Sequence, residues 1–140
     1  MVRNNSSVAV VESLKRMLLD AASVGYSASV SGQYLVDELW PQLGVADAVL
    51  AKARCIGDER IGAVVARGEV EIGFEQMSEL LPVPGIAHVT PLPPEAQKIT
   101  TFSGGVAASS PHPARARAVL QFLCTQPARQ AFLDSGLRPV

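Results

Sequence analysis

Two short polar segments carry the residues best suited to hold a ligand. The first, residues 27–32, has the sequence Ser-Ala-Ser-Val-Ser-Gly. Three hydroxyl groups stand just before a predicted helix, whose first turn has free N–H groups and the positive end of the helix dipole. Donors that converge in this way suit an anion. We therefore take Ser27, Ser29, Ser31 and Gly32 as candidate ligand-binding residues, with a helix cap on a flexible turn as the alternative.

The second segment is the polar end of residues 68–79, which pass from a helix end through a strand pattern into a new helix start. Its last five residues are Glu-Gln-Met-Ser-Glu. Gln76 and Ser78 can donate hydrogen bonds, and we take both as candidate ligand-binding residues. Glu75 and Glu79 would repel an anion unless they point away. The alternative for Ser78 is a simple helix cap.

The sequence offers little for catalysis. His88 lies within a strand pattern and His112 within a loop, so no Ser-His-Asp set can be recognised. A G-x-S-x-G elbow, a P-loop and a G-x-G-x-x-G motif are all missing. Cys55 and Cys124 are far apart and have no partners at metal-ligand spacing. We therefore predict a protein that is not an enzyme, has no catalytic residues, and holds neither a metal nor a cofactor.

Composition excludes several partners. The 140 residues are 48% hydrophobic and 18% charged, which is typical of a globular chain with an aliphatic core. A formal net charge of -1 gives no field that would steer nucleic acid. No apolar run of about 18 residues is present to span a membrane. Residues 1–7 are polar, so we expect no signal peptide, and a cytoplasmic location if the chain is expressed as given.

Hydrophobic spacing predicts alternating strands and helices. We expect an α/β fold of the layered α/β/α type, with a mostly parallel sheet, in one domain over residues 1–140. The α/β lobe of this domain would be about residues 8–108, followed by C-terminal helices in about residues 109–140. The expected strands lie at residues 23–27, 54–56, 69–75 and 86–92. The expected helices lie at residues 7–22, 47–53 and 110–123, with others ending at Gly44, capped by Asp58 and capped by Thr125.

The order of these motifs from residue 11 to the end resembles a known family. The helix Val-Glu-Ser-Leu-Lys-Arg-Met-Leu-Leu precedes the strand at 24–27 and the serine-rich helix start. Residues 68–79 follow, and then Leu-Leu-Pro-Val-Pro-Gly-Ile, Pro-Leu-Pro and Pro-Ala-Arg-Ala-Arg in that order. This order is similar to the later part of type-2 periplasmic substrate-binding proteins of ABC transporters, and most similar to the molybdate-binding branch.

The resemblance implies a solute-binding protein that clamps a small anion, such as a molybdate-like oxyanion, between two α/β lobes. It implies a periplasmic location and an ABC transporter permease as partner. It maps the ligand donors onto the same six residues, Ser27, Ser29, Ser31, Gly32, Gln76 and Ser78.

The family's first lobe has no counterpart in this sequence, so the resemblance describes a truncated member. The helices of residues 109–140 would then lack their usual partner, and apolar residues such as Val119, Leu123 and Phe132 would favour self-association. A self-associating structural module without a ligand is therefore the alternative function. An enzyme is the third hypothesis.

Overall fold

The computed structural model describes residues 5–140, which form two compact units. The first unit ends at Lys98 and the second is Ile99–Val140. The prediction of one domain over the whole chain stays a prediction.

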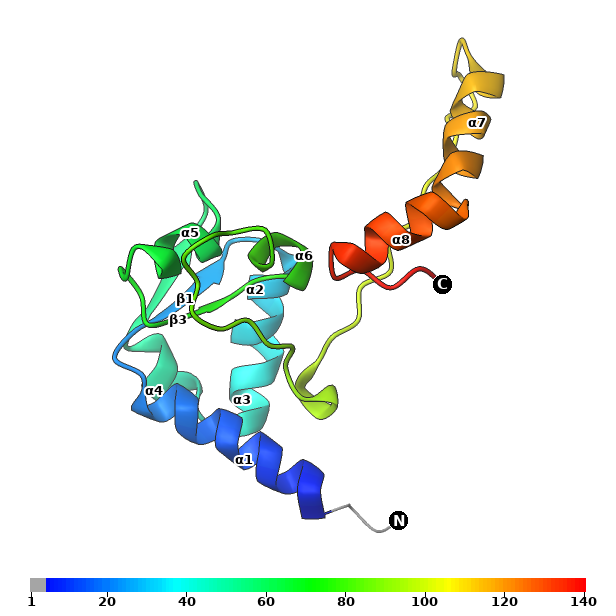
Figure 1. Cartoon of the computed structure of the whole chain (residues 1–140). Coiled ribbons are helices and arrows are strands. Elements are labelled where there is room, and N and C mark those ends of the chain that lie inside the picture. Colours follow the sequence, from blue (N-terminus) through cyan, green and yellow to red (C-terminus); the bar gives the residue numbers. More distant parts are fainter. Residues whose placement is uncertain (1–4) are drawn as a thin grey trace. The chain divides into compact units, whose positions relative to one another are not determined.

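The first unit is built on a sheet of three short parallel strands (Figure 1). They are β1 (Val24–Ser27), β2 (Ala53–Ile56) and β3 (Ile72–Phe74). The order is β2-β1-β3, with Val24 paired to both Ala53 and Ile72. The central position of β1 explains why its residues are mostly buried. The predicted α/β class with a parallel sheet is confirmed.

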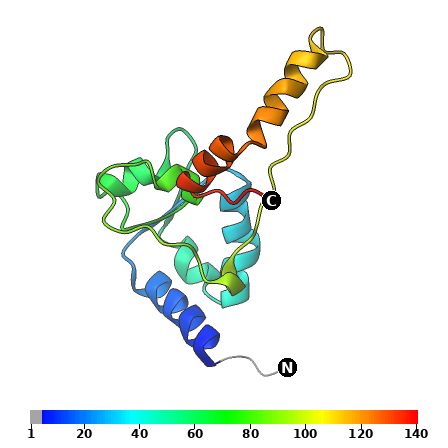
Figure 2. The ribbon, with the colours of Figure 1, turned by 45° about the vertical axis from the view of Figure 1, so that its right-hand side comes forward.

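Helices connect the strands, as parallel pairing requires. A continuous helical run from Val30 to Leu43 follows β1 and has a π-helical middle, and it ends at Gly44, whose φ of 68° is left-handed. Figure 2 shows this cyan run as a single rod. The helical elements of the first unit are α1 (Asn5–Asp20), α2 (Val30–Tyr34), η1 (Leu35–Leu39), α3 (Trp40–Leu43), α4 (Ala46–Leu50), α5 (Ile61–Ala66), α6 (Met77–Leu80) and the 3-10 turn η2 (Pro94–Ala96).

The larger core lies on one face of the sheet. Aliphatic residues of α1, the Val30–Leu43 run and α4 pack there around Val24. Trp40 is fully buried and meets the edge of the Tyr26 ring, with centroids 5.5 Å apart. The indole N–H of Trp40 is buried without a hydrogen-bond partner. This face fixes the direction of the helical run that starts at the carboxyl end of β1.

A smaller core on the other face holds α5 against the sheet. Ile56, Ile61, Val64 and Val70 form it. A Cβ on Gly73 would come within 2.4 Å of Ile61 Cγ2, so only glycine lets α5 lie this close to β3. Helices on both faces give the predicted layering.

Two local predictions are wrong. Residues 86–92 form no strand, because the surrounding prolines lack the N–H group that a sheet needs. Asp58 does not cap α5, whose N-cap position is Arg60.

The second unit consists of a long irregular segment and two helices, α7 (Pro113–Leu123) and α8 (Gln126–Asp134). Thr125 occupies the N-cap position of α8, as predicted. Val119, Phe122 and Leu133 are exposed. No helix within residues 5–140 is long and apolar enough to cross a membrane.

Candidate functional site

An open depression lies where the carboxyl ends of the three strands meet. Ligands of open parallel sheets bind at this edge, where the chain leaves neighbouring strands toward opposite faces. Its volume is about 440 Å³. The loops that follow β1 and β2, the residue that follows β3, and α6 all contribute to it. The lining residues are Ser27, Ala28, Ser29, Ile56, Gly57, Asp58, Glu59, Arg60, Glu75 and Glu79.

Three serine hydroxyls converge at the end of β1. Ser27 Oγ lies 2.6 Å from Ser29 Oγ, and Ser29 Oγ lies 2.8 Å from Ser31 Oγ. The third side, from Ser27 to Ser31, is 3.4 Å. We call these residues the serine triad. Each hydroxyl carries one hydrogen that can turn between partners, so the triad can redirect donors toward an oxygen anion.

The triad also leaves the start of the helix open. Ser29 holds the N-cap position in extended conformation, but its side chain makes no cap hydrogen bond. An N-cap serine ordinarily accepts from the second or third N–H of its helix. Since Ser29 instead contacts Ser27 and Ser31, no side-chain cap occupies the first-turn N–H groups. These groups and the hydroxyls form one donor cluster.

Gly32 makes the cluster possible through close packing. A Cβ on Gly32 would lie 1.7 Å from the carbonyl oxygen of Ser27. Any other residue would push the helix start away from the end of β1. Gly32 is buried, so its contribution is the position of its neighbours.

Two neighbouring glutamate side chains also line the depression. Glu75 follows β3 and Glu79 lies one helical turn later in α6. Burial raises the pKa of Glu75, and the neighbouring Glu79 carboxylate raises it further. The backbone amides of Gly62 and Ile61 act in the opposite direction. Glu75 Oε2 is buried without a hydrogen-bond partner. The pair is therefore suited to hold a proton.

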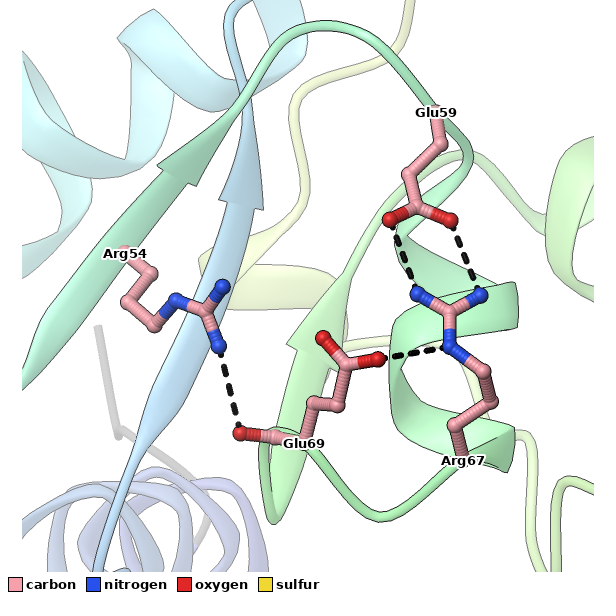
Figure 3. A network of polar contacts seen from close by, with 4 residues as sticks. All are labelled: Arg54, Glu59, Arg67 and Glu69. Carbon is pink, nitrogen blue, oxygen red and sulfur yellow. Dashed lines mark hydrogen bonds and ion pairs between the residues drawn. The ribbon is translucent and has the colours of Figure 1, made fainter.

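The loop between β2 and α5 adds further charges. Asp58, Glu59 and Arg60 line the depression. Arg67, at the end of α5, donates hydrogen bonds to both carboxylate oxygens of Glu59, with Nη1–Oε2 and Nη2–Oε1 distances of 2.9 and 2.8 Å (Figure 3). Hydrogen bonding from Arg67 lowers the pKa of Glu59. The same guanidinium donates from Nε to Glu69 Oε1 at 2.6 Å.

The structure brings together part of the predicted site. Ser27, Ser29 and Ser31 converge, and Ser27 and Ser29 line the depression. Gln76 occupies the N-cap position of α6 and Ser78 lies inside that helix, both outside the lining. Ser78 is therefore not a cap. The role of all six residues in binding stays a prediction.

Sequence reasoning missed the contribution of the loop after β2. Asp58, Glu59 and Arg60 follow a strand end, as the two chosen segments do, so the same rule would have found them. The sequence pattern presents Glu75 and Glu79 only as sources of repulsion. The burial that raises the pKa of Glu75 is a property of the folded chain and is not visible in the sequence. Among residues 5–140 no group of three metal-binding side chains is present.

The chain belongs to a family of bacterial extracellular solute-binding proteins, because residues 1–138 match the model of that family. This confirms the resemblance to substrate-binding proteins at the level of the family. The molybdate-binding branch is not confirmed. No solved structure matches the chain significantly.

A relative with a stated activity is an aconitate isomerase from a Pseudomonas species. It is 48% identical over 130 residues, which are 93% of this chain and 50% of the relative. The chain thus spans half the length of this relative. The prediction that the chain is not an enzyme is wrong, because a protein this similar is named as an enzyme.

Proposed function

We propose that this chain forms one lobe of an enzyme that isomerises aconitate or a closely related unsaturated tricarboxylate. The observation that carries the proposal is the 48% identity to an aconitate isomerase over 93% of the chain. The activity would reside in the protein expressed from the complete gene, since the chain spans half of that relative. In this proposal, residues that line the depression at the strand ends take part in each step of the reaction.

In this proposal the serine triad and the first turn of the Val30–Leu43 run bind one substrate carboxylate. The hydroxyls lie within 3.4 Å of one another, so they can share one pair of carboxylate oxygens. The helix dipole favours a negative charge at that position. Arg60, on the neighbouring loop, can meet a second carboxylate.

The reaction itself requires movement of a proton. Aconitate has a carbon–carbon double bond and a methylene group next to it. Removal of a methylene proton lets the electron pair form a new double bond, and return of a proton to the far carbon completes the change without net gain or loss of atoms. Glu75, whose raised pKa favours its protonated form, as acid and Glu79 as base would perform both transfers. A raised pKa brings a carboxyl group closer to the range in which it is an effective acid and base.

Capture of a solute for transport is the second candidate function. The description of the family as extracellular solute-binding proteins supports it. A small oxyanion of the molybdate kind would then occupy the serine triad, the protein would lie in the periplasm, and a transporter permease would be its partner. The exposed apolar residues of α7 and α8 would support a self-associating form.

The test follows interconversion of cis- and trans-aconitate by proton NMR in the presence of the complete gene product. We expect conversion by the wild type. Replacement of all three triad serines by alanine should raise KM at least tenfold, because each lost hydrogen bond to a charged group contributes about 1.5–3 kcal/mol. Ser13→Ala is the matched control, since this hydroxyl bonds only the Ala9 carbonyl on α1.

Calorimetric titration with aconitate and with molybdate separates the two candidates. Binding of molybdate without any conversion of aconitate would support the second candidate. Neither conversion nor binding of aconitate by the wild type would refute the enzymatic proposal.

A further inference from the structure

The depression presents a charge problem for any anion. Four carboxylate side chains line it, from Asp58, Glu59, Glu75 and Glu79, against the single cation Arg60 among the described lining residues. Like charges brought together without compensation weaken binding. Something near the site must remove part of this charge before a tricarboxylate can enter.

Arg67 is positioned to offset part of this negative charge. It lies outside the lining, yet its planar group meets Glu59 with two parallel hydrogen bonds of 2.8 and 2.9 Å. Such bidentate pairs fix the carboxylate in position as well as cancelling its charge. Figure 3 shows Arg67 reaching back from the end of α5 to the loop that carries Glu59.

A second contact keeps Arg67 in this orientation. Its Nε donates to Glu69 Oε1 at 2.6 Å, and Arg54 on β2 donates to the backbone carbonyl of Glu69 at 3.4 Å (Figure 3). Glu69 therefore binds the guanidinium at Nε, while the two Nη groups point toward Glu59. Residues of β2, the loop after it and the end of α5 are joined in one network.

Neutralising Glu59 has a direct consequence for its neighbour. Arg60 is adjacent in the sequence and also lines the depression. If Glu59 were unpaired, it would compete for the Arg60 guanidinium and repel an approaching anion. With Glu59 held by Arg67, Arg60 can pair with the substrate.

We propose that Arg67 is a positioning residue for anion binding, which holds and neutralises Glu59 so that a substrate carboxylate can approach Arg60. This inference rests on the proposed function, since it concerns affinity for the same tricarboxylate. It predicts an effect on KM and on the dissociation constant, with kcat nearly unchanged, because Arg67 does not touch the reacting atoms.

The test is a double-mutant cycle between Arg67 and Glu59 in the complete gene product. Dissociation constants for trans-aconitate are measured by calorimetry at low and high ionic strength. We expect Arg67→Gln to weaken binding about fivefold at low salt and less at high salt, the range that one uncompensated surface charge produces. Removing the carboxylate as well, in Arg67→Gln with Glu59→Gln, should restore the wild-type affinity.

The rescue distinguishes the proposal from a merely structural role. A variant that loses affinity by loosening the loop would not regain it when Glu59 is also replaced, so an equally weak double variant overturns the proposal. Unchanged affinity in Arg67→Gln also overturns it. Arg16→Gln on α1 is the matched control and should bind as the wild type does. If the wild type itself binds no aconitate, the proposed function fails first and this inference with it.

Discussion

Replacement of Gly32 by alanine tests whether the serine triad depends on close packing of a helix on a strand end. The new Cβ would lie 1.7 Å from the Ser27 carbonyl oxygen and 2.8 Å from its carbonyl carbon, where real contacts stay above 3.0 Å. Both obstructing atoms belong to the backbone and cannot rotate away. The start of the helix must therefore move off β1.

The change in the free energy of unfolding caused by Gly32→Ala can be calculated from two opposing effects. Forcing a methyl group into a packed site costs typically 1–3 kcal/mol, and a backbone obstacle places this case at about 3 kcal/mol. Alanine recovers about 1 kcal/mol over glycine inside a helix. The net loss of about 2 kcal/mol should lower the urea midpoint by about 1 M, at a slope of about 2 kcal/mol per M.

The control is Gly57→Ala. Its Cβ would meet only the Ala28 Cβ at 3.5 Å, an ordinary contact. We expect its stability to stay the same or to rise by about 0.5 kcal/mol, because alanine has a less flexible unfolded state. Gly32→Ala should also weaken binding of aconitate at least tenfold, because the helix start leaves the triad. Equal urea midpoints for the two variants, with equal affinity, would refute the reasoning.

Two further predictions concern buried polar groups. The pKa of Glu75 is raised above the usual range of a glutamate, chiefly by burial and then by Glu79. A carboxyl group with a raised folded-state pKa contributes stability that is complete below the unfolded pKa and is lost as pH rises through the folded pKa. Urea unfolding should therefore show the wild type losing stability as pH rises above 4.5, and Glu75→Gln losing less; parallel curves would contradict this. Trp40→Phe should cost less than about 1.5 kcal/mol, because it removes an indole N–H that has no partner, whereas Trp40→Ala should cost about 3–5 kcal/mol. Equal losses in thermal unfolding would show that the unpaired N–H is not the deciding feature.

The alternation of strands and helices could be predicted wherever short-range patterns decide the structure. The strand pattern of residues 23–27 and the helix pattern that follows Asp58 each define one element. Both lie within a residue or two of their predicted positions. Residues 86–92 show where such prediction fails. Their pattern is that of a strand, but the neighbouring prolines have no N–H group to donate to an adjacent strand.

Only those site residues that directly follow a predicted strand could be identified from the sequence. Ser27 and Ser29 were found because they follow a buried strand, a position that the sequence exposes. Arg67 could not be found, because its partner Glu59 is eight residues away across a helix, and nothing in the spacing selects that pair over others. Burial at Glu75 depends on the packing of α6 against α5, which is a property of the folded chain.

Anion binding and proton transfer at this site would depend on the same charges. A carboxylate substrate cannot sit beside Glu75 and Glu79 while both are ionised, so one shared proton lowers the repulsion. That proton is also the one that an isomerisation must return to carbon. Arg67 offsets the charge of Glu59 in a different way, by an ion pair in which the carboxylate holds no proton to donate. The depression thus has two kinds of neutralised carboxylate, and only the pair of Glu75 and Glu79 can exchange a proton with a substrate. For this reason Glu75→Gln should lower kcat, whereas Arg67→Gln should raise KM alone.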